Sequence, residues 1–184
     1  MKPKNQRLTT ERLVLKSLED GDREALLRMA KDEQIKKTYM LPDFRDQAQE
    51  DVFFRRMRAL SVAEDRFVYG IYLNGELIGF LNDCGTDGAK IELGYFISSA
   101  HWNRGCATEA LGAAIEELFR MGFDRVTAGY FAENPASRRV MEKCGMRPAP
   151  AEAVINYRGV DHRCLYCEIR RQEAGTEDEH EKMV

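Results

Sequence analysis

The sequence predicts a single domain of the α/β (α+β) class, built from a mixed sheet with flanking helices. Apolar residues alternate with a period of two in several short segments, which is typical of strands. Between these segments the apolar period changes to that of a helix, most clearly from Thr108 to Met121. Because strand patterns lie on both sides of this helix, we expect at least one helical crossover within one layered domain.

The first half of the chain predicts a strand, two helices and a hairpin. Asn74-Gly75 separates two apolar runs, and Asn-Gly in this position is the strongest short signal for a two-residue hairpin turn. Residues 84–89 contain Gly and Asp and predict a further turn. The expected elements are the strand Thr10–Lys16, the helix Asp20–Ala30 capped by Asp20, the helix Asp46–Ser61 and the strands Arg66–Leu73 and Glu76–Asn82.

The second half predicts the crossover helix, a shorter helix and a final hairpin. Gly122 is a natural stop for the long helix, since glycine readily ends a helix in the left-handed conformation. The expected elements are the strand Lys90–Ile97, the helix Thr108–Met121, the strand Val126–Phe131, the helix Ala136–Lys143, and the strands Val154–Tyr157 and His162–Ile169 joined at Arg158-Gly159. Residues 1–171 form the expected domain, and the charged residues 172–184, which lack aromatics, form an expected disordered tail.

Charge and composition exclude several classes of partner. Lys and Arg total 28 against 31 Asp and Glu, so the net charge is -3 and no general affinity for nucleic acid is expected. The polar first residues lack the apolar stretch of a signal peptide, and no apolar segment is long enough to cross a membrane. The five cysteines match no disulfide framework, so we expect free thiols in a reducing cytoplasm.

Cys164 and Cys167 form a lone Cys-x-x-Cys that could indicate zinc or redox chemistry. The flanking residues read as a strand, where residues three positions apart point to opposite faces. A structural zinc site needs four ligands, and no second pair follows. We therefore interpret both cysteines as packing residues and expect no metal.

The junction between Ile97 and Thr108 carries the strongest chemical signal. A strand ends, a polar turn follows, and a helix begins near Arg104-Gly105. The first N–H groups of a helix have no intrahelical partner and lie at the positive end of its dipole, which favours phosphate. Gly105 lets the backbone approach an anion closely, and neither a Walker loop nor a three-glycine dinucleotide motif is present.

Three segments together resemble the GCN5-related N-acetyltransferase (GNAT) superfamily, within it the ribosomal-protein alanine N-acetyltransferase branch. They are Thr10–Leu15 (TERLVL), Glu92–Ile97 (ELGYFI) continuing through Trp102–Ala110 (WNRGCATEA), and Asn134–Met146 (NPASRRVMEKCGM). The resemblance covers roughly residues 10–170 and implies a mostly antiparallel mixed sheet of six to seven strands with splayed central strands. It implies an acyltransferase that uses acetyl-CoA, and it allows a homodimer, since many relatives dimerise.

The resemblance also assigns residues to the coenzyme. Main-chain N–H groups of the helix start would hold the pyrophosphate, the end of the central strand would pair its backbone with the pantetheine arm, and Asn134 would bond a pantetheine amide. The implied binding residues are Tyr95, Phe96, Ile97, Trp102, Asn103, Arg104, Gly105, Cys106, Ala107, Thr108, Asn134 and Ser137.

Two side chains are candidates for the proton transfers. A primary amine is mostly protonated at neutral pH, so a base is required, and Glu92 matches the family's Glu-x-Gly-Tyr pattern. It would act directly or through water. Met141 stands where many members of the superfamily carry a Tyr that protonates the departing thiolate. The branch usually lacks this Tyr and has Ser at the position of Ser137, so the resemblance implies that Ser137 protonates the sulfur.

The acceptor is expected to be a protein or peptide N-terminal α-amine, attacked directly. A small-molecule amine, such as a polyamine or an aminoglycoside, is an alternative, because the segments expected to face the acceptor contain no sequence motif that identifies it. A sensor that binds acyl-CoA without catalysis is a third hypothesis, which the absence of the Tyr at Met141 keeps open.

Overall fold

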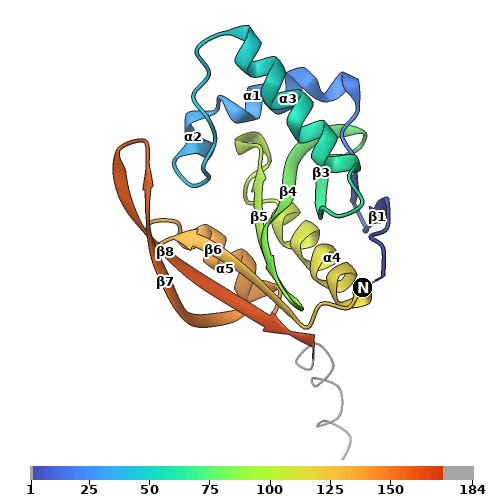
Figure 1. Ribbon diagram of the computed structural model, residues 1–184, viewed down its shortest axis with the longest axis vertical. Coiled ribbons are helices and arrows are strands. Elements are labelled where there is room, and N and C mark those ends of the chain that lie inside the picture. The colour runs from blue at the N-terminus through green and yellow to red at the C-terminus, as the bar shows by residue number, and fades with distance from the viewer. Residues whose placement is uncertain (1, 172–184) are drawn as a thin grey trace, which may run out of the picture.

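The computed structural model describes residues 2–171, which form one eight-stranded mixed sheet in the order β1-β2-β3-β4-β5-β6-β8-β7 (Figure 1). All neighbouring strands are antiparallel except β5 and β6, which are parallel because a helix connects them. The strands are β1 (Arg7–Thr9), β2 (Leu13–Lys16), β3 (Val68–Leu73), β4 (Glu76–Asp87), β5 (Lys90–Ile97), β6 (Arg125–Phe131), β7 (Arg147–Tyr157) and β8 (Val160–Arg170).

Helices cover both faces of the sheet and divide the core into two clusters. On one face α4 packs against β2, β5 and β6, with Leu111 and Leu118 fully buried. On the other face α1 and α3 pack against β3 and β4. The helices are α1 (Arg23–Ala30), α2 (Glu33–Lys36), α3 (Gln47–Val62), α4 (Cys106–Met121) and α5 (Pro135–Lys143), with short 3-10 turns at Asp20–Asp22 and Ser99–His101.

The central strands β5 and β6 are paired over only part of their length. Their parallel register runs from Lys90 opposite Arg125 to Leu93 opposite Ala128 and then stops. Beyond this point β5 continues beside β4 and β6 continues beside β8, so the two strands part. We call this opening the fork; Gly94 and Gly129 are the first residue beyond it on each strand.

The predicted class, the splayed strands and most of the elements are confirmed. The hairpin turn is at Asn74-Gly75, both with positive φ, and Gly122 ends α4 with φ 113°. The sheet has one strand more than expected, because β1 was not predicted. The four-residue helix α2 was also missed, since one turn is too short to display a helical period. The expected tail, residues 172–184, lies outside the described residues.

Three local predictions were wrong. Residues 84–87 are part of β4, because a bulge between Asp83 and Gly85 lets the strand continue past an irregular stretch of sequence. The turn lies at Gly88, with φ 58°. Asp20 does not cap the first helix; it begins a 3-10 turn that precedes α1. The strand expected from residue 154 begins at residue 147, beyond a further register shift.

Candidate active site

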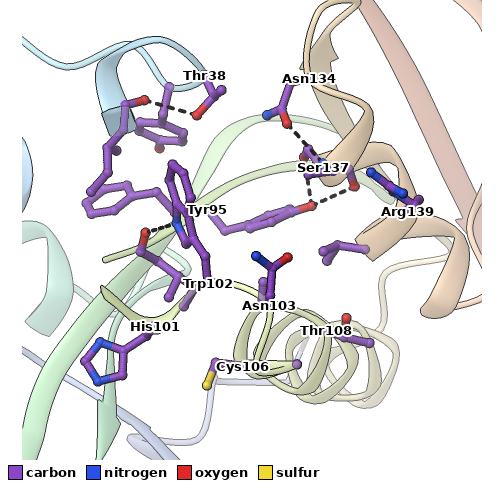
Figure 2. Close-up of a pocket in the computed structure, with 18 of the residues that line it drawn as sticks. Thr38, Tyr95, His101, Trp102, Asn103, Cys106, Thr108, Asn134, Ser137 and Arg139 are labelled. Carbon is purple, nitrogen blue, oxygen red and sulfur yellow. Dashed lines mark hydrogen bonds between the residues drawn. The ribbon is translucent and has the colours of Figure 1, made fainter. Parts of the chain in front are cut away.

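A cavity of about 480 Å³ opens at the fork. Its walls are β5 and β6, the start of α4, α5, and the segment around α2 (Figure 2). Both Gly94 and Gly129 line it. A Cβ on Gly94 would stand 2.9 Å from the Tyr39 hydroxyl, and a Cβ on Gly129 would stand 3.0 Å from the Tyr166 ring. Glycine is therefore needed on both arms of the fork for this packing.

The start of α4 presents unpaired backbone amides to the cavity. Gly105 is the N-cap in the left-handed conformation, with φ 77°. The first intrahelical bond joins the Glu109 N–H to the Gly105 carbonyl at 3.0 Å. The preceding amides of Cys106, Ala107 and Thr108 therefore have no partner within the helix, and all three residues line the cavity. Free amides at the positive end of a 16-residue helix form a site for a diphosphate.

The N-terminal segment holds this turn in place. The Arg12 guanidinium donates to the Arg104 carbonyl at 2.9 Å and to the Glu109 carboxylate at 2.7 Å. The Arg12 backbone N–H also donates to Glu109, at 2.8 Å. Arg104, a predicted binding residue, is not among the residues that line the cavity; the structure shows it in the turn before α4, where its carbonyl accepts from Arg12. Asn103 lines the cavity and has a positive φ of 59°.

The end of β5 supplies the opposite wall of the cavity. Tyr95, Phe96 and Ile97 all line it. The Trp102 indole N–H donates to the Ile97 carbonyl at 2.8 Å and so ties the turn to the strand end. Because β5 pairs with β6 only as far as Leu93, the free edge of β5 begins at Gly94. Its backbone groups can pair with the extended arm of a ligand that lies between β5 and β6.

Tyr95 and Ser137 meet on the α4 and α5 face of the sheet. The Tyr95 hydroxyl lies 3.0 Å from the Ser137 Oγ and 3.3 Å from the Ser137 carbonyl oxygen. Burial raises the pKa of Tyr95, so its hydroxyl remains protonated at neutral pH. The Asn134 side chain accepts the Ser137 backbone N–H at 3.2 Å and caps α5 (Figure 2). Asn134 is therefore a helix cap as well as a cavity residue.

Glu92 is placed close to the fork but outside the cavity lining. It lies on β5 two residues before Gly94, on the strand face opposite to the buried Ile91 and Leu93. Burial raises the pKa of Glu92, and the nearby Lys90 only partly offsets this. The pKa of Tyr166 is raised to about 12, mainly by burial, and the nearby charge of Glu92 contributes to this rise. No carboxylate of the described residues lines the cavity itself.

Sequence reasoning missed several cavity residues, and two groups of them stand out. Ile35, Thr38 and Tyr39 come from the α2 segment, which had no sequence signal. Arg139 and Lys143 come from α5 and bring two positive charges to the coenzyme side. Their spacing of four residues on a helix places them on one face, and this spacing could have identified them.

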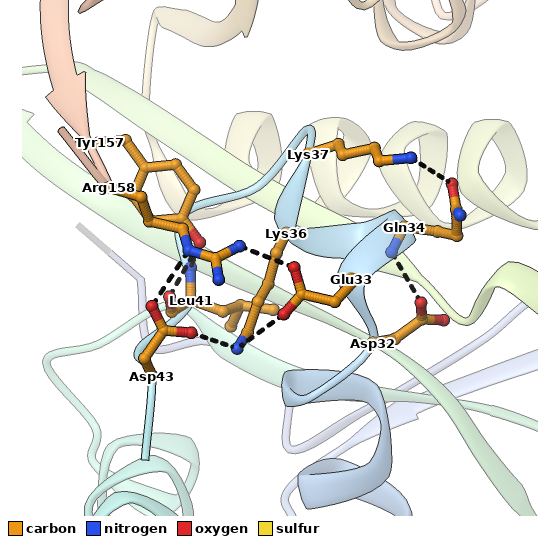
Figure 3. Close-up of polar contacts among 9 residues, drawn as sticks. All are labelled: Asp32, Glu33, Gln34, Lys36, Lys37, Leu41, Asp43, Tyr157 and Arg158. Atoms are coloured by element: carbon orange, nitrogen blue, oxygen red, sulfur yellow. Dashed lines mark hydrogen bonds and ion pairs between the residues drawn. The ribbon is translucent and has the colours of Figure 1, made fainter. Parts of the chain in front are cut away.

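A cluster of ion pairs joins the α2 segment to the last hairpin. The tip of the β7–β8 hairpin lies beside α2, where Arg158 donates to Glu33 at 2.7 Å and to Asp43 at 3.0 Å (Figure 3). The nearly buried Lys36 also pairs with Asp43, at 2.6 Å. The Tyr157 hydroxyl donates to the Leu41 carbonyl at 2.9 Å and accepts the Leu41 N–H at 3.2 Å. We call this group the clasp, because it joins segments more than 110 residues apart.

The site fits a ligand with a diphosphate and a long neutral arm, which is the chemistry of coenzyme A. The amides of α4 suit the diphosphate, the positive charges of α5 suit further phosphate, and the free edge at the fork suits the amides of the arm. Such a fold and site define an acyltransferase that takes its acyl group from coenzyme A.

Comparisons with known proteins agree. The family model described as an acetyltransferase (GNAT) domain matches residues 12–147, so the chain belongs to the GNAT family. The uncharacterized N-acetyltransferase YoaA of Bacillus subtilis is 28% identical over 145 residues, covering 76% of this chain and 82% of the relative. The protein is thus an acyltransferase with acetyl-CoA as donor.

Solved structures share the fold. A GNAT-family acetyltransferase from Bacillus anthracis superposes with a TM-score of 0.76 at 24% identity, covering 90% of this chain and 99% of the other. The ribosomal L7/L12 alpha-N-protein acetyltransferase RimL, in complex with coenzyme A, gives a TM-score of 0.74 at 15% identity, with 89% and 96% covered.

The described residues contain no group of His, Cys, Asp and Glu that could hold a metal ion. None of the helices within residues 2–171 has the length and apolar character needed to span a membrane.

Gly105 provides a test of the amide site. We expect Gly105→Ala to weaken binding of acetyl-CoA by roughly tenfold, because a side chain in the left-handed conformation costs about 1–2 kcal/mol and displaces the turn. Calorimetry measures the affinity. Gly112→Ala is the matched control, since it lies within the same helix with nothing within 4 Å of its added Cβ. It should retain the affinity and raise the melting temperature. Equal affinity in both variants would contradict the assigned phosphate site.

Proposed function

We propose that this enzyme acetylates the α-amine of a protein or peptide N-terminus by direct attack on the thioester. The observation that carries the proposal is the fork, which opens a passage through the sheet. On one face are the α4 amides and Ser137, and on the other are the α2 segment and Glu92. A donor held on the first face can present its carbonyl to an amine that arrives on the second.

Glu92 is the proposed base and acts through water. Its raised pKa brings the carboxyl group closer to neutral pH, where a base is most effective. It takes one proton from the ammonium group, and the neutral amine nitrogen then forms a bond to the carbonyl carbon. The second proton that this nitrogen loses on becoming an amide passes to solvent. The carbon–sulfur bond then breaks, and the departing sulfur takes the electron pair. Main-chain N–H groups at the free edge of β5 would steady the negative oxygen in between.

Ser137 is the proposed acid on the coenzyme side. Met141, at the position of the usual tyrosine, is fully buried and has no proton to give. The Ser137 hydroxyl lines the cavity and has the Tyr95 hydroxyl beside it. Tyr95 can donate to the Ser137 oxygen and leave the serine proton free for the thiolate. Tyr95 is thus a positioning residue for this step.

The form of the acceptor side supports a slender acceptor. The clasp ties the α2 segment, which is one wall of the cavity, to the tip of the β7–β8 hairpin, so this wall is fixed in place. A flexible chain end can enter beside a fixed wall more readily than a broad, rigid molecule. The motif resemblance to N-terminal acetyltransferases supports the same acceptor, as does the name of the neighbour RimL, whose likeness extends only to the fold.

A screen of acceptors with the purified protein tests the proposal. Thiol release from acetyl-CoA is measured with N-terminal peptides, Nα-blocked peptides that contain lysine, polyamines and aminoglycosides. We expect turnover with free N-termini and loss of turnover when they are blocked. Turnover only with small-molecule amines would overturn the N-terminal assignment. Tight binding of acetyl-CoA without release by any acceptor would favour a sensor.

Glu92→Gln should lower kcat/KM by about 10²-fold at pH 7, because general base catalysis is removed. The wild-type rate should rise with pH through the raised pKa of Glu92, as the carboxylate forms. In the variant the rise of the rate with pH should instead follow the pKa of the acceptor, which is near 8 for an α-amine. Above that pH the difference in kcat/KM between the variant and wild type should become smaller. Glu64→Gln, at an exposed site after α3, is the control. A variant with the wild-type pH profile would exclude Glu92 as the base.

Ser137→Ala should lower kcat by roughly tenfold while the affinity for acetyl-CoA stays within about twofold, since a general acid acts in the transition state. The substitution retains the backbone N–H that Asn134 caps, so the melting temperature should change little. Steady-state kinetics and calorimetry give the two quantities. An unchanged kcat would remove Ser137 from the mechanism.

A further inference from the structure

A second cavity, of about 240 Å³, lies behind the first. We call it the rear chamber. It lies between α1, α3, the loop after Tyr39 and the inner face of β3 and β4, and it is open to solvent near Met40 and Arg56. Most of its walls are apolar; they include Leu26, Phe53, Met57, Leu60, Val68 and Phe80. None of the roles assigned above uses this space.

Among residues 2–171, only Tyr39 and Phe96 border both cavities. Their rings are in contact, with centroids 5.0 Å apart, and the Phe96 ring also stacks on Phe80 at 6.0 Å. The two rings therefore form the partition between the fork and the rear chamber. Phe96 is held within β5, whereas Tyr39 belongs to the loop that follows α2.

A hydrogen bond fixes the Tyr39 ring in this position. Its hydroxyl donates to the Asn82 side-chain oxygen at 2.6 Å. Asn82 lies opposite Gly94 in the β4–β5 register, so the hydroxyl stands directly over the first residue of the fork. A group that extends from the thioester carbonyl toward the rear chamber would meet this ring first.

The charges of the rear chamber indicate which reactant it can accept. Its ionisable lining residues are Tyr39 and two arginines, Arg56 and Arg66, and no carboxylate of the described residues lines it. Arg66 is paired with Asp83 at 2.8 Å. An acceptor arrives as a protonated amine and would be repelled here. A neutral hydrocarbon chain suits the apolar walls, because its burial removes apolar surface from water.

We propose that Tyr39 restricts the donor to acetyl by separating the thioester from the rear chamber, and that the rear chamber accepts a short acyl chain once this ring is removed. The proposal rests on the placement of the thioester at the fork given above. Tyr39 thus determines the length of the acyl chain that the enzyme accepts. The ligands concerned are straight-chain acyl-CoA thioesters.

The test compares acetyl-, butyryl- and hexanoyl-CoA with wild type, Tyr39→Ala and Tyr39→Phe. We expect kcat/KM for butyryl-CoA relative to acetyl-CoA to rise at least tenfold in Tyr39→Ala, since each buried methylene is worth about fourfold. Tyr39→Phe retains the ring and should keep the wild-type ratio. An unchanged ratio in a folded Tyr39→Ala protein would overturn the proposal.

Tyr39→Leu serves where the alanine variant does not fold, because it keeps more apolar volume and is expected to change the ratio in the same direction. Adding Met57→Trp to either variant should fill the rear chamber and reverse the gain. A change of acceptor preference across a peptide panel, with the donor ratio unchanged, would assign the chamber to the acceptor and reject the proposal.

Calorimetry with the same thioesters separates this inference from the proposed reaction. Removing Tyr39 should increase the affinity for butyryl-CoA relative to acetyl-CoA even without an acceptor. If wild type binds acetyl-CoA but shows no turnover, the proposed function fails while the binding ratio still tests the partition. If wild type turns over but Tyr39→Ala keeps the wild-type binding ratio, only the partition fails.

Discussion

The end of pairing between β5 and β6 is the constraint on which the site depends. The parallel pairing stops after Leu93 and Ala128, so beyond these residues the backbone groups on the facing edges of β5 and β6 do not bond to each other. Such groups are costly to bury alone, so the opening favours a ligand that is itself extended and rich in amides. Gly94 and Gly129 allow the neighbouring tyrosines and cysteines to pack closely over the arms of the fork. The cavity is thus a consequence of sheet geometry, and the side chains around it adapt that opening to one ligand.

Segments from opposite ends of the chain hold the fork in shape. Arg12 ties the N-terminal segment to the turn before α4 through Glu109 and the Arg104 carbonyl. At the acceptor side, Arg158 and Tyr157 tie the last hairpin to the α2 segment. Exposed ion pairs contribute little to stability singly. Their importance here lies in position, since each ties a segment that lines the cavity to a part of the chain that is distant in sequence.

The helix start at Arg104-Gly105 could be predicted from local sequence, whereas the α2 segment and the clasp could not, and the reason is physical. The phosphate site uses main-chain amides, a helix start and a glycine, all of which depend on local sequence and leave a visible pattern at Arg104-Gly105. The acceptor side uses α2, a single turn, and the clasp, whose members come from both ends of the chain. Register shifts at Asp83 and Pro148 were likewise invisible, because a bulge is set by the partner strand as much as by its own residues. Glu92 was placed on the correct strand face by alternation alone, but its distance from the cavity required the three-dimensional structure.

In the proposed mechanism the sheet also separates the two proton transfers. Glu92 lies on one face, where burial raises its pKa, and the Tyr95–Ser137 pair lies on the other, where burial keeps the tyrosine protonated. A base and an acid in direct contact would exchange the proton with each other and leave neither in the state that the reaction needs. Held on opposite faces of the fork, each can act on its own reactant within one complex. This arrangement favours direct transfer over an acyl-enzyme: Cys106, the cysteine that lines the cavity, is almost fully buried and lies at the phosphate end, away from the proposed base.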